Sequence, residues 1–185
     1  MTGIRCFVAV DIPSEMREEI RRLQGQVAMD GVRLVRPELV HVTLKFLGDQ
    51  SEERVEEIIE ALAKIRVKPF PARIKGMGAF PGRSIRVIWL GLEGSFLELY
   101  ERMEEALGPS GIERETRGFS PHVTLGRLAR PGPELNQKLA PKIAALSGID
   151  LGSFMVDRFF LKKSTLTRGG PIYDDLAMFS LRDRE

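Results

Sequence analysis

The spacing of apolar residues along the 185-residue chain predicts four amphipathic helices. Apolar residues recur at intervals of three and four after Ser14, Ser51 and Ser95, and again in the stretch that contains Pro141. That spacing places them on one face of a helix. Ser95 and Glu98 have the spacing of a capping box, so we expect them to cap the third helix. Pro141 is expected to kink or split the fourth.

Short apolar runs between these helices predict the strands. We expect strands at residues 7–10, 32–35, 40–46, 69–77, 87–92, 119–127, 151–158, 159–166 and 173–181. The mixture of helices and strands predicts an α+β fold. We expect two pseudo-symmetric lobes, each a mainly antiparallel sheet with helices on the outside, and an active-site cleft between the lobes.

One tetrapeptide, His-Val-Thr-Leu, occurs twice in the chain. It begins at His41 and again at His122, an offset of 122 − 41 = 81 residues. Ser14 and Ser95 have the same offset, as an internal repeat requires. We therefore predict a single bilobal domain over residues 1–185, with an internal repeat of offset 81 and motif strands near 40–46 and 119–127.

The composition is that of a globular protein, with 43% hydrophobic and 29% charged residues and a net charge of +2. Cys6 is the single cysteine, which excludes an intramolecular disulfide and fits a reducing cytoplasm. It lies in an apolar run too short for a signal peptide core, so we expect it to be a buried small side chain. The predicted location is cytoplasmic.

Acidic and basic residues are distributed differently along the chain. Glutamates concentrate on the predicted helices, whereas many bases lie in predicted loops and strand ends, among them Arg36, Arg114, Arg117, Arg127 and Arg168. This segregation predicts a basic cleft on an otherwise acidic body, as a protein that binds nucleic acid requires.

The repeated tetrapeptide suits phosphodiester chemistry. Residues i and i+2 of a strand share a face, so His41 lies beside Thr43 and His122 beside Thr124. An imidazole titrates near neutrality, so one histidine can accept a proton while the other donates one. Threonine hydroxyls can donate hydrogen bonds to phosphoryl oxygens. This scheme needs no metal and no cofactor.

Two other interpretations of the histidines were compared with this one. A single histidine beside a threonine on a strand is usually structural, but both histidines of the chain lie in the same repeated tetrapeptide. Two histidines are also too few for a metal site, which usually has three or four protein ligands. The catalytic interpretation is therefore favoured.

The sequence is similar to the 2H phosphoesterase superfamily, and specifically to the RNA 2′,3′-cyclic phosphodiesterases, also named 2′-5′ RNA ligases. The resemblance covers nearly the whole chain. It includes residues 5–10 (RCFVAV) with Pro13, 41–48 (HVTLKFLG), 86–91 (RVIWLG), 119–127 (FSPHVTLGR), 163–164 (KS) and 170–173 (GPIY).

The resemblance implies a role for each motif residue. His41 would be the proton donor to the 3′-oxygen and His122 the proton acceptor that activates water, leaving a 2′-phosphate. Thr43 and Thr124 would bind the phosphate. Family members also join RNA ends through a 2′-5′ linkage. The expected partner is RNA with a 2′,3′-cyclic phosphate terminus, tRNA fragments included, and we expect a monomer.

Three further residues are candidates for substrate binding. Phe46 and Arg127 both lie five positions after a motif histidine, and both types can stack on nucleobases. Simple strand parity places them on the face opposite the histidines, unless the strand ends or bulges first. Lys45 keeps the histidine's parity and is a third candidate, for the phosphate.

Two alternative functions remain open from the sequence. One is a cyclic phosphodiesterase that acts on a small nucleotide, which would show no gain in activity on longer RNA. The other is a non-catalytic RNA-binding module, which would retain its function without the two histidines.

Overall fold

A computed structural model describes residues 3–81 and 84–183. The helices are α1 (Arg17–Val27), α2 (Glu52–Leu62), α3 (Phe96–Leu107) and α4 (Pro133–Ala145), with short 3-10 turns at Ser14–Met16, Pro37–Leu39 and Gly108–Ser110. The strands are β1 (Ile4–Asp11), β2 (Val32–Leu34), β3 (His41–Gln50), β4 (Phe70–Phe80), β5 (Val87–Glu93), β6 (His122–Leu128), β7 (Asp150–Val156), β8 (Arg158–Thr167) and β9 (Gly170–Ser180). Within the described ranges, none of the helices has the length and apolarity needed to cross a membrane.

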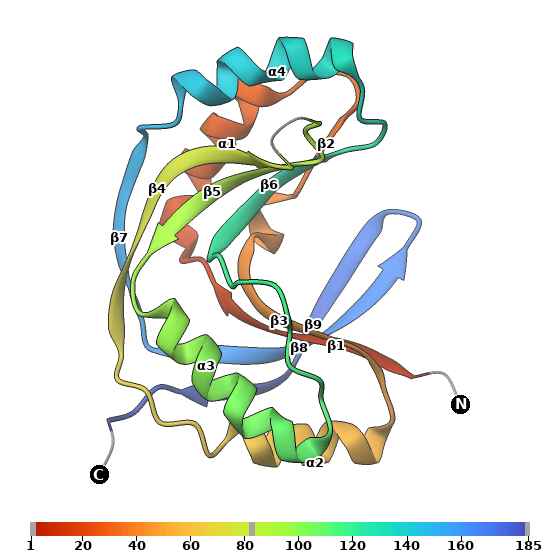
Figure 1. Cartoon of the computed structure of the whole chain (residues 1–185), viewed down its shortest axis with the longest axis vertical. Coiled ribbons are helices and arrows are strands. Elements are labelled where there is room, and N and C mark those ends of the chain that lie inside the picture. The colour runs from red at the N-terminus through yellow and green to blue at the C-terminus, as the bar shows by residue number, and fades with distance from the viewer. Residues whose placement is uncertain (1–2, 82–83, 184–185) are drawn as a thin grey trace.

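The strands form one nine-stranded antiparallel sheet, which has two halves that are joined where β3 pairs with β6. Strands β3, β1, β8 and β9 follow one another in the first, and β7, β4, β5 and β6 in the second, with β2 on the outer part of β6. In the described residues, Val42 and Val123 are the single pair that joins β3 to β6. The two strands then diverge, so the molecule has two lobes (Figure 1).

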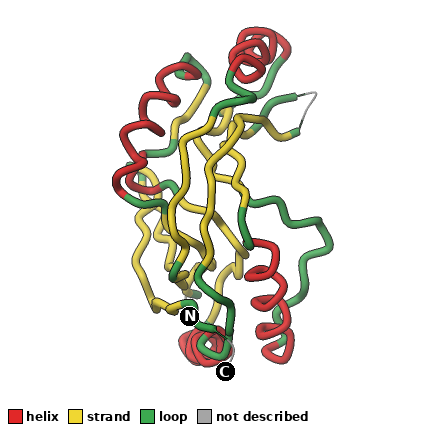
Figure 2. Tube along the Cα trace, turned by 90° about the vertical axis from the view of Figure 1, so that its left-hand side faces the viewer, coloured by secondary structure: helices red, strands yellow, loops and turns green. Residues whose placement is uncertain are grey.

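Each lobe takes one helix from each half of the sequence. Helices α2 and α3 pack together on the β1 lobe, and α1 and α4 pack together on the β5 lobe. Strand β4 also comes from the first half of the sequence but lies in the second lobe, where it pairs with β5. Figure 2 shows the strands in the middle and the helices outside. The predicted α+β fold with two lobes is confirmed, and its lobes interleave the two halves of the chain.

The core follows the predicted apolar runs. Strand β1 is central in its lobe, between β3 and β8, so its residues 6–10 are all buried. Cys6 lies within this run, and burial, followed by the nearby Asp49 carboxylate, raises the pKa of its thiol to about 11. Helix α1 buries Ile20, Leu23 and Val27 on the face that the spacing predicted.

The starts of the helices and the course of α4 test the local expectations. The Ser95 side chain makes no cap hydrogen bond, because its backbone (φ −76°, ψ 32°) lies outside the extended conformation of a side-chain cap. Ser14 begins a 3-10 turn and its hydroxyl bonds to Glu15 instead. Helix α4 continues through Pro141 as one element, which excludes a split at this residue. The Ser51 side chain caps α2, accepting from the backbone N–H of Arg54 at 3.3 Å.

Candidate active site

The pairing of Val42 with Val123 fixes the arrangement of both motifs. Both valines are fully buried, so the residues on either side of each valine point to the opposite, accessible face. That face carries His41 and Thr43 from β3, and His122 and Thr124 from β6. The register places each histidine of one strand beside the threonine of the other. All four side chains are half-buried.

Both imidazoles are held by the same backbone contact. Nδ1 of His41 lies 2.8 Å from the carbonyl oxygen of Leu39, and Nδ1 of His122 lies 2.8 Å from that of Ser120. A carbonyl oxygen only accepts hydrogen bonds, so Nδ1 carries the hydrogen in each ring. The neutral form of either ring therefore has its lone pair on Nε2, which is free to accept a proton.

Each imidazole is also enclosed by two aromatic rings. The His41 ring lies 5.0 Å from Phe7 and 5.3 Å from Tyr173, which it meets edge to face. The His122 ring lies 5.1 Å from Phe80, also edge to face, and 6.5 Å from Trp89. These rings limit the rotation of each imidazole and hold Nε2 in one direction. None of these four aromatic residues was predicted as part of the site, because they come from β1, β4, β5 and β9 and share no spacing with the motifs.

The surroundings of His41 favour its neutral form in the free protein. Burial is the largest influence and lowers the pKa of His41. The bond to the Leu39 carbonyl and the Asp11 carboxylate raise this pKa, whereas the positive charges of Lys162 and Arg127 lower it. Lys162 is itself buried and forms ion pairs with Asp11 at 3.0 Å and with Asp175 at 2.6 Å. This ion-pair network beside His41 is a second feature that the sequence did not predict.

A β-bulge in each motif strand decides where the residues after the tetrapeptide point. Along β3, the partners in β1 skip Leu44, and along β6, the partners in β5 skip Leu125. These two leucines are the fourth residues of the two tetrapeptides. A bulge adds one residue and reverses the alternation beyond it. Phe46 and Arg127 are therefore exposed on the histidine side.

The bulge also overturns the prediction for Lys45, which it turns into the interior. Its side chain is 2% exposed, and Nζ bonds to Glu104 of α3 at 2.6 Å and to the carbonyl oxygen of Glu113 at 2.8 Å. All of its charge is thus engaged away from the motif face, so Lys45 is a structural residue and not a phosphate ligand.

Each bulge is supported by a helix from the other half of the sequence. Gln24 of α1 is buried, and its amide donates to the carbonyl oxygens of Val35 at 2.6 Å and of the bulged Leu125 at 2.9 Å. In the β1 lobe, Glu104 of α3 holds Lys45, the residue after the other bulge. Because the helices are exchanged between the lobes, each motif strand is supported by a residue from the other half of the chain.

Comparison with known proteins places the chain in a family. The model of the family described as "LigT like Phosphoesterase" matches residues 10–89 and 92–173, and each stretch contains one tetrapeptide. The chain belongs to this family. The resemblance noted in the sequence is thus confirmed. Among the described residues, no group of three or more His, Cys, Asp or Glu side chains is arranged to hold a metal ion.

Relatives of this LigT-like phosphoesterase match it over nearly its full length. It is 37% identical over 173 residues to a protein of Methanocaldococcus jannaschii and 38% identical over 180 residues to one of Archaeoglobus fulgidus, both named RNA 2′,3′-cyclic phosphodiesterase. These alignments cover 92% and 95% of this chain, and 97% and 99% of the relatives.

Solved structures share the fold. The crystal structure of TT0787 of Thermus thermophilus matches with a TM-score of 0.80 at 33% identity, covering 98% of this chain and 100% of the other. The crystal structure of E. coli LigT complexed with 3′-AMP matches with a TM-score of 0.78 at 28% identity, covering 97% and 98%.

Proposed function

We propose that this protein hydrolyses the 2′,3′-cyclic phosphate at the 3′ end of RNA to a 2′-phosphate, with two histidines as acid and base. The observation that carries the proposal is the pairing of Val42 with Val123, which brings two copies of a histidine–threonine pair to one accessible face. The names of relatives that match over nearly the full length support the RNA substrate.

In the proposed reaction, His122 and His41 act on opposite sides of the phosphorus. Nε2 of His122 takes a proton from water, whose oxygen forms the new bond to phosphorus. The bond between phosphorus and the ribose 3′-oxygen breaks, and Nε2 of His41 gives its proton to that oxygen. Each histidine ends in the protonation state in which the other began, and exchange with solvent restores both.

The remaining residues of the motif face would bind the substrate. Thr43 and Thr124 donate hydrogen bonds to the two nonbridging phosphoryl oxygens, where negative charge is concentrated. Phe46 offers an exposed aromatic face to the terminal base, and Arg127 offers a guanidinium to the phosphate or the base. Tyr173 adds an aromatic edge beside His41.

The depressed pKa of His41 bears directly on its role as proton donor. In the free protein the neutral imidazole is favoured because the side chain is buried beside Arg127 and Lys162. An anionic phosphate bound next to the ring would stabilise the imidazolium. Substrate binding would therefore favour protonation of His41, which can then donate that proton to the leaving oxygen. Run in reverse, with an RNA 5′-hydroxyl in place of water, the same groups would form a 2′-5′ linkage.

The first experiment identifies the product formed from an RNA oligonucleotide that ends in a 2′,3′-cyclic phosphate, with a chelator present throughout. A 2′-phosphate is expected, and both His41→Ala and His122→Ala should abolish its formation. A 3′-phosphate would retain the enzyme class and reverse the two roles. RNA binding with no turnover would instead support the non-catalytic module.

A sulfur-substituted substrate assigns the two roles separately. When sulfur replaces the bridging 3′-oxygen, the leaving group needs no proton. The donor variant should then recover activity and the acceptor variant should not. Recovery by His122→Ala in place of His41→Ala would exchange the assignments.

A further inference from the structure

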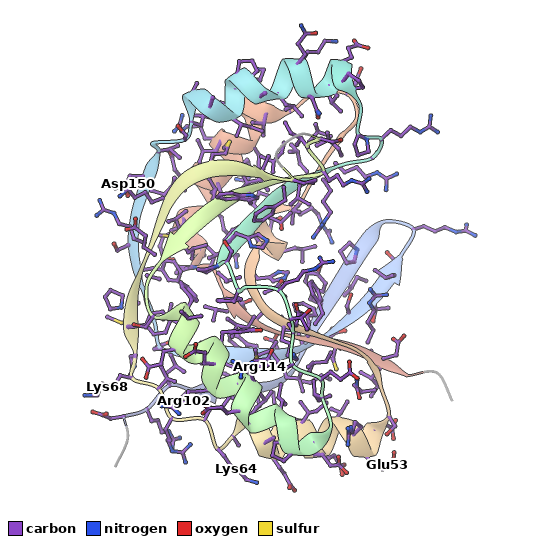
Figure 3. The ribbon with its side chains drawn as sticks, viewed as in Figure 1. Glu53, Lys64, Lys68, Arg102, Arg114 and Asp150 are labelled. Carbon is purple, nitrogen blue, oxygen red and sulfur yellow. The ribbon has the colours of Figure 1, made fainter. Side chains whose placement is uncertain are left out.

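A groove continues from Phe46 away from the motif face. It has a volume of about 440 Å³ and lies between residues 45–47 of β3 and residues 112–117, the segment that leads from α3 to β6. Both walls are thus direct extensions of the catalytic motifs, one following the first histidine and one preceding the second. Figure 3 labels Arg114 on this segment, in front of the β1 lobe. The volume lies within the range of small-ligand sites, about 300–1,000 Å³, and suits a single nucleotide.

The groove combines an aromatic face with unpaired cations. Phe46 at its edge is 63% exposed, and it is the one aromatic among the large apolar side chains that are exposed in the described residues. Arg114 and Arg117 are exposed and have no carboxylate within ion-pair distance in the described part of the chain. An aromatic platform followed by guanidinium groups is the usual arrangement for single-stranded nucleic acid.

The backbone of this segment is anchored from beneath. Lys45 donates to the carbonyl oxygen of Glu113, and Phe119 stacks on Tyr100 of α3 with ring centroids 4.4 Å apart and planes 2° from parallel. The exposed side chains of Arg114 and Arg117 therefore project from a segment that is anchored at both ends. Fixed cations lose less conformational freedom when they bind an anion than cations on a mobile loop do.

We propose that this groove binds the nucleotide on the 5′ side of the cyclic terminus, so that an RNA chain is a better substrate than a mononucleotide. The inference rests on the proposed function. If His41 protonates the ribose oxygen, the terminal ribose lies on the β1 lobe and its base reaches Phe46. The chain that leaves its 5′-oxygen then passes Phe46 into the groove, where Arg114 and Arg117 receive its phosphates.

The experiment compares adenosine 2′,3′-cyclic phosphate with a trinucleotide that ends in the same cyclic nucleotide. The wild-type protein should have the higher kcat/KM on the trinucleotide. The double variant Arg114→Ala/Arg117→Ala should lose roughly tenfold on the trinucleotide, as expected for lost hydrogen bonds to charged groups, and should keep its mononucleotide activity. Arg102→Ala is the matched control, because Arg102 lies on α3 outside the groove and pairs with Glu105.

Two further measurements test the charge of the groove. Glu113 and Glu115 also line it, so Glu113→Gln/Glu115→Gln should raise kcat/KM on the trinucleotide. Each phosphate contact contributes about −0.7 to the slope of log affinity against log salt for single strands. The arginine double variant should therefore bind the trinucleotide with a slope shallower by about 1.4.

Three outcomes would overturn the inference. They are equal wild-type activity on both substrates, an equal loss on both substrates in the arginine variant, or a loss confined to ligation, which would place the acceptor strand in the groove. Failure of the wild-type protein to open either cyclic phosphate would instead reject the proposed function, so the two failures are distinguishable.

Discussion

Val42 pairs with Val123 where the two halves of the sheet are joined, and this contact sets the geometry of the site. Both side chains are completely buried, so neither strand can rotate its motif away from the shared face without exposing a valine. Beyond this pair the strands separate and the two lobes begin (Figure 1). The histidines thus sit where the lobes are closest, each positioned by its own lobe.

The titration of His41 should respond to the charges around it. We expect its pKa to lie below the ordinary 6.5 because the ring is buried. Removing the positive charge in Arg127→Gln should raise this pKa, and removing the negative charge in Asp11→Asn should lower it further. NMR titration of the imidazole resonances would measure both shifts, since the chain has only two histidines.

The same shifts should appear in the pH profile of kcat/KM. The active form has one histidine protonated and the other neutral, so the titration of His41 sets one limb of the profile. That limb should therefore move to higher pH in Arg127→Gln and to lower pH in Asp11→Asn. His122→Ala assigns the remaining resonance to His41. Movement of both variants in the same direction would contradict the electrostatic explanation.

Gly78 of β4 should be intolerant of any side chain. A Cβ at this position would lie 2.3 Å from Cζ2 of Trp89, so the indole beside His122 would have to move. We expect Gly78→Ala to reduce kcat and to destabilise the fold by about 1–3 kcal/mol, as overpacking does. Enzyme kinetics and urea unfolding would measure the two effects.

Gly25 provides the matched control for this substitution. It lies on the exposed side of α1, and an added Cβ would meet nothing within 4 Å. Gly25→Ala should leave kcat unchanged and stabilise the protein by about 0.5–1 kcal/mol, because alanine is the better helix former. If Gly78→Ala were equally neutral, Trp89 could not be a fixed wall of the His122 site.

The sequence predicted the parts of the site whose signal is local. A repeated tetrapeptide on two strands is readable from strand parity alone, and the four motif residues do share a face. The direction of the residues beyond it was not readable, since a bulge at Leu44 leaves no mark in the alternation of apolar residues. That bulge is why Lys45 was assigned to the site and why parity argued against Phe46.

The tertiary surroundings of the motifs were beyond sequence reasoning for a different reason. Tyr173 reaches His41 from the last strand, and Trp89 reaches His122 from β5. Such contacts depend on strand order. That order was not predictable, because β4 and α1 of the first half of the chain lie in the β5 lobe, and α3 of the second half lies in the β1 lobe. Periodicity reports which side of an element is buried, not which element covers it.

Lys45 and Glu104 form a buried ion pair. Loss of one partner should destabilise the protein strongly, whereas replacement of both by apolar residues should be tolerated. Both side chains are at most 2% exposed. Burial of the phenol, followed by the nearby Glu104 carboxylate, raises the pKa of Tyr100 to about 12. Lys45→Met leaves the Glu104 carboxylate buried without its partner, so we expect a loss of about 3–5 kcal/mol in unfolding free energy.

The double variant Lys45→Met/Glu104→Leu tests this explanation. It removes both charges and fills the space with apolar atoms, so most of the lost stability should return. Urea unfolding of the single and double variants gives the comparison. Equal instability of the two would show that the bond from Lys45 to the Glu113 carbonyl, which both variants lack, is the dominant contribution.

The two motif threonines should contribute equally to catalysis. Threonine and valine have nearly the same shape, so Thr43→Val and Thr124→Val remove a hydroxyl and leave the packing of each strand intact. If each hydroxyl donates to one nonbridging oxygen as charge develops, each variant should lose roughly 10²-fold in kcat with little change in KM. Thr165→Val on the exposed part of β8 is the control and should retain full activity.

A large loss from one threonine and none from the other would mean that the phosphate is bound from one lobe only. The two-fold arrangement of the motifs would then be a property of the fold and not of the reaction.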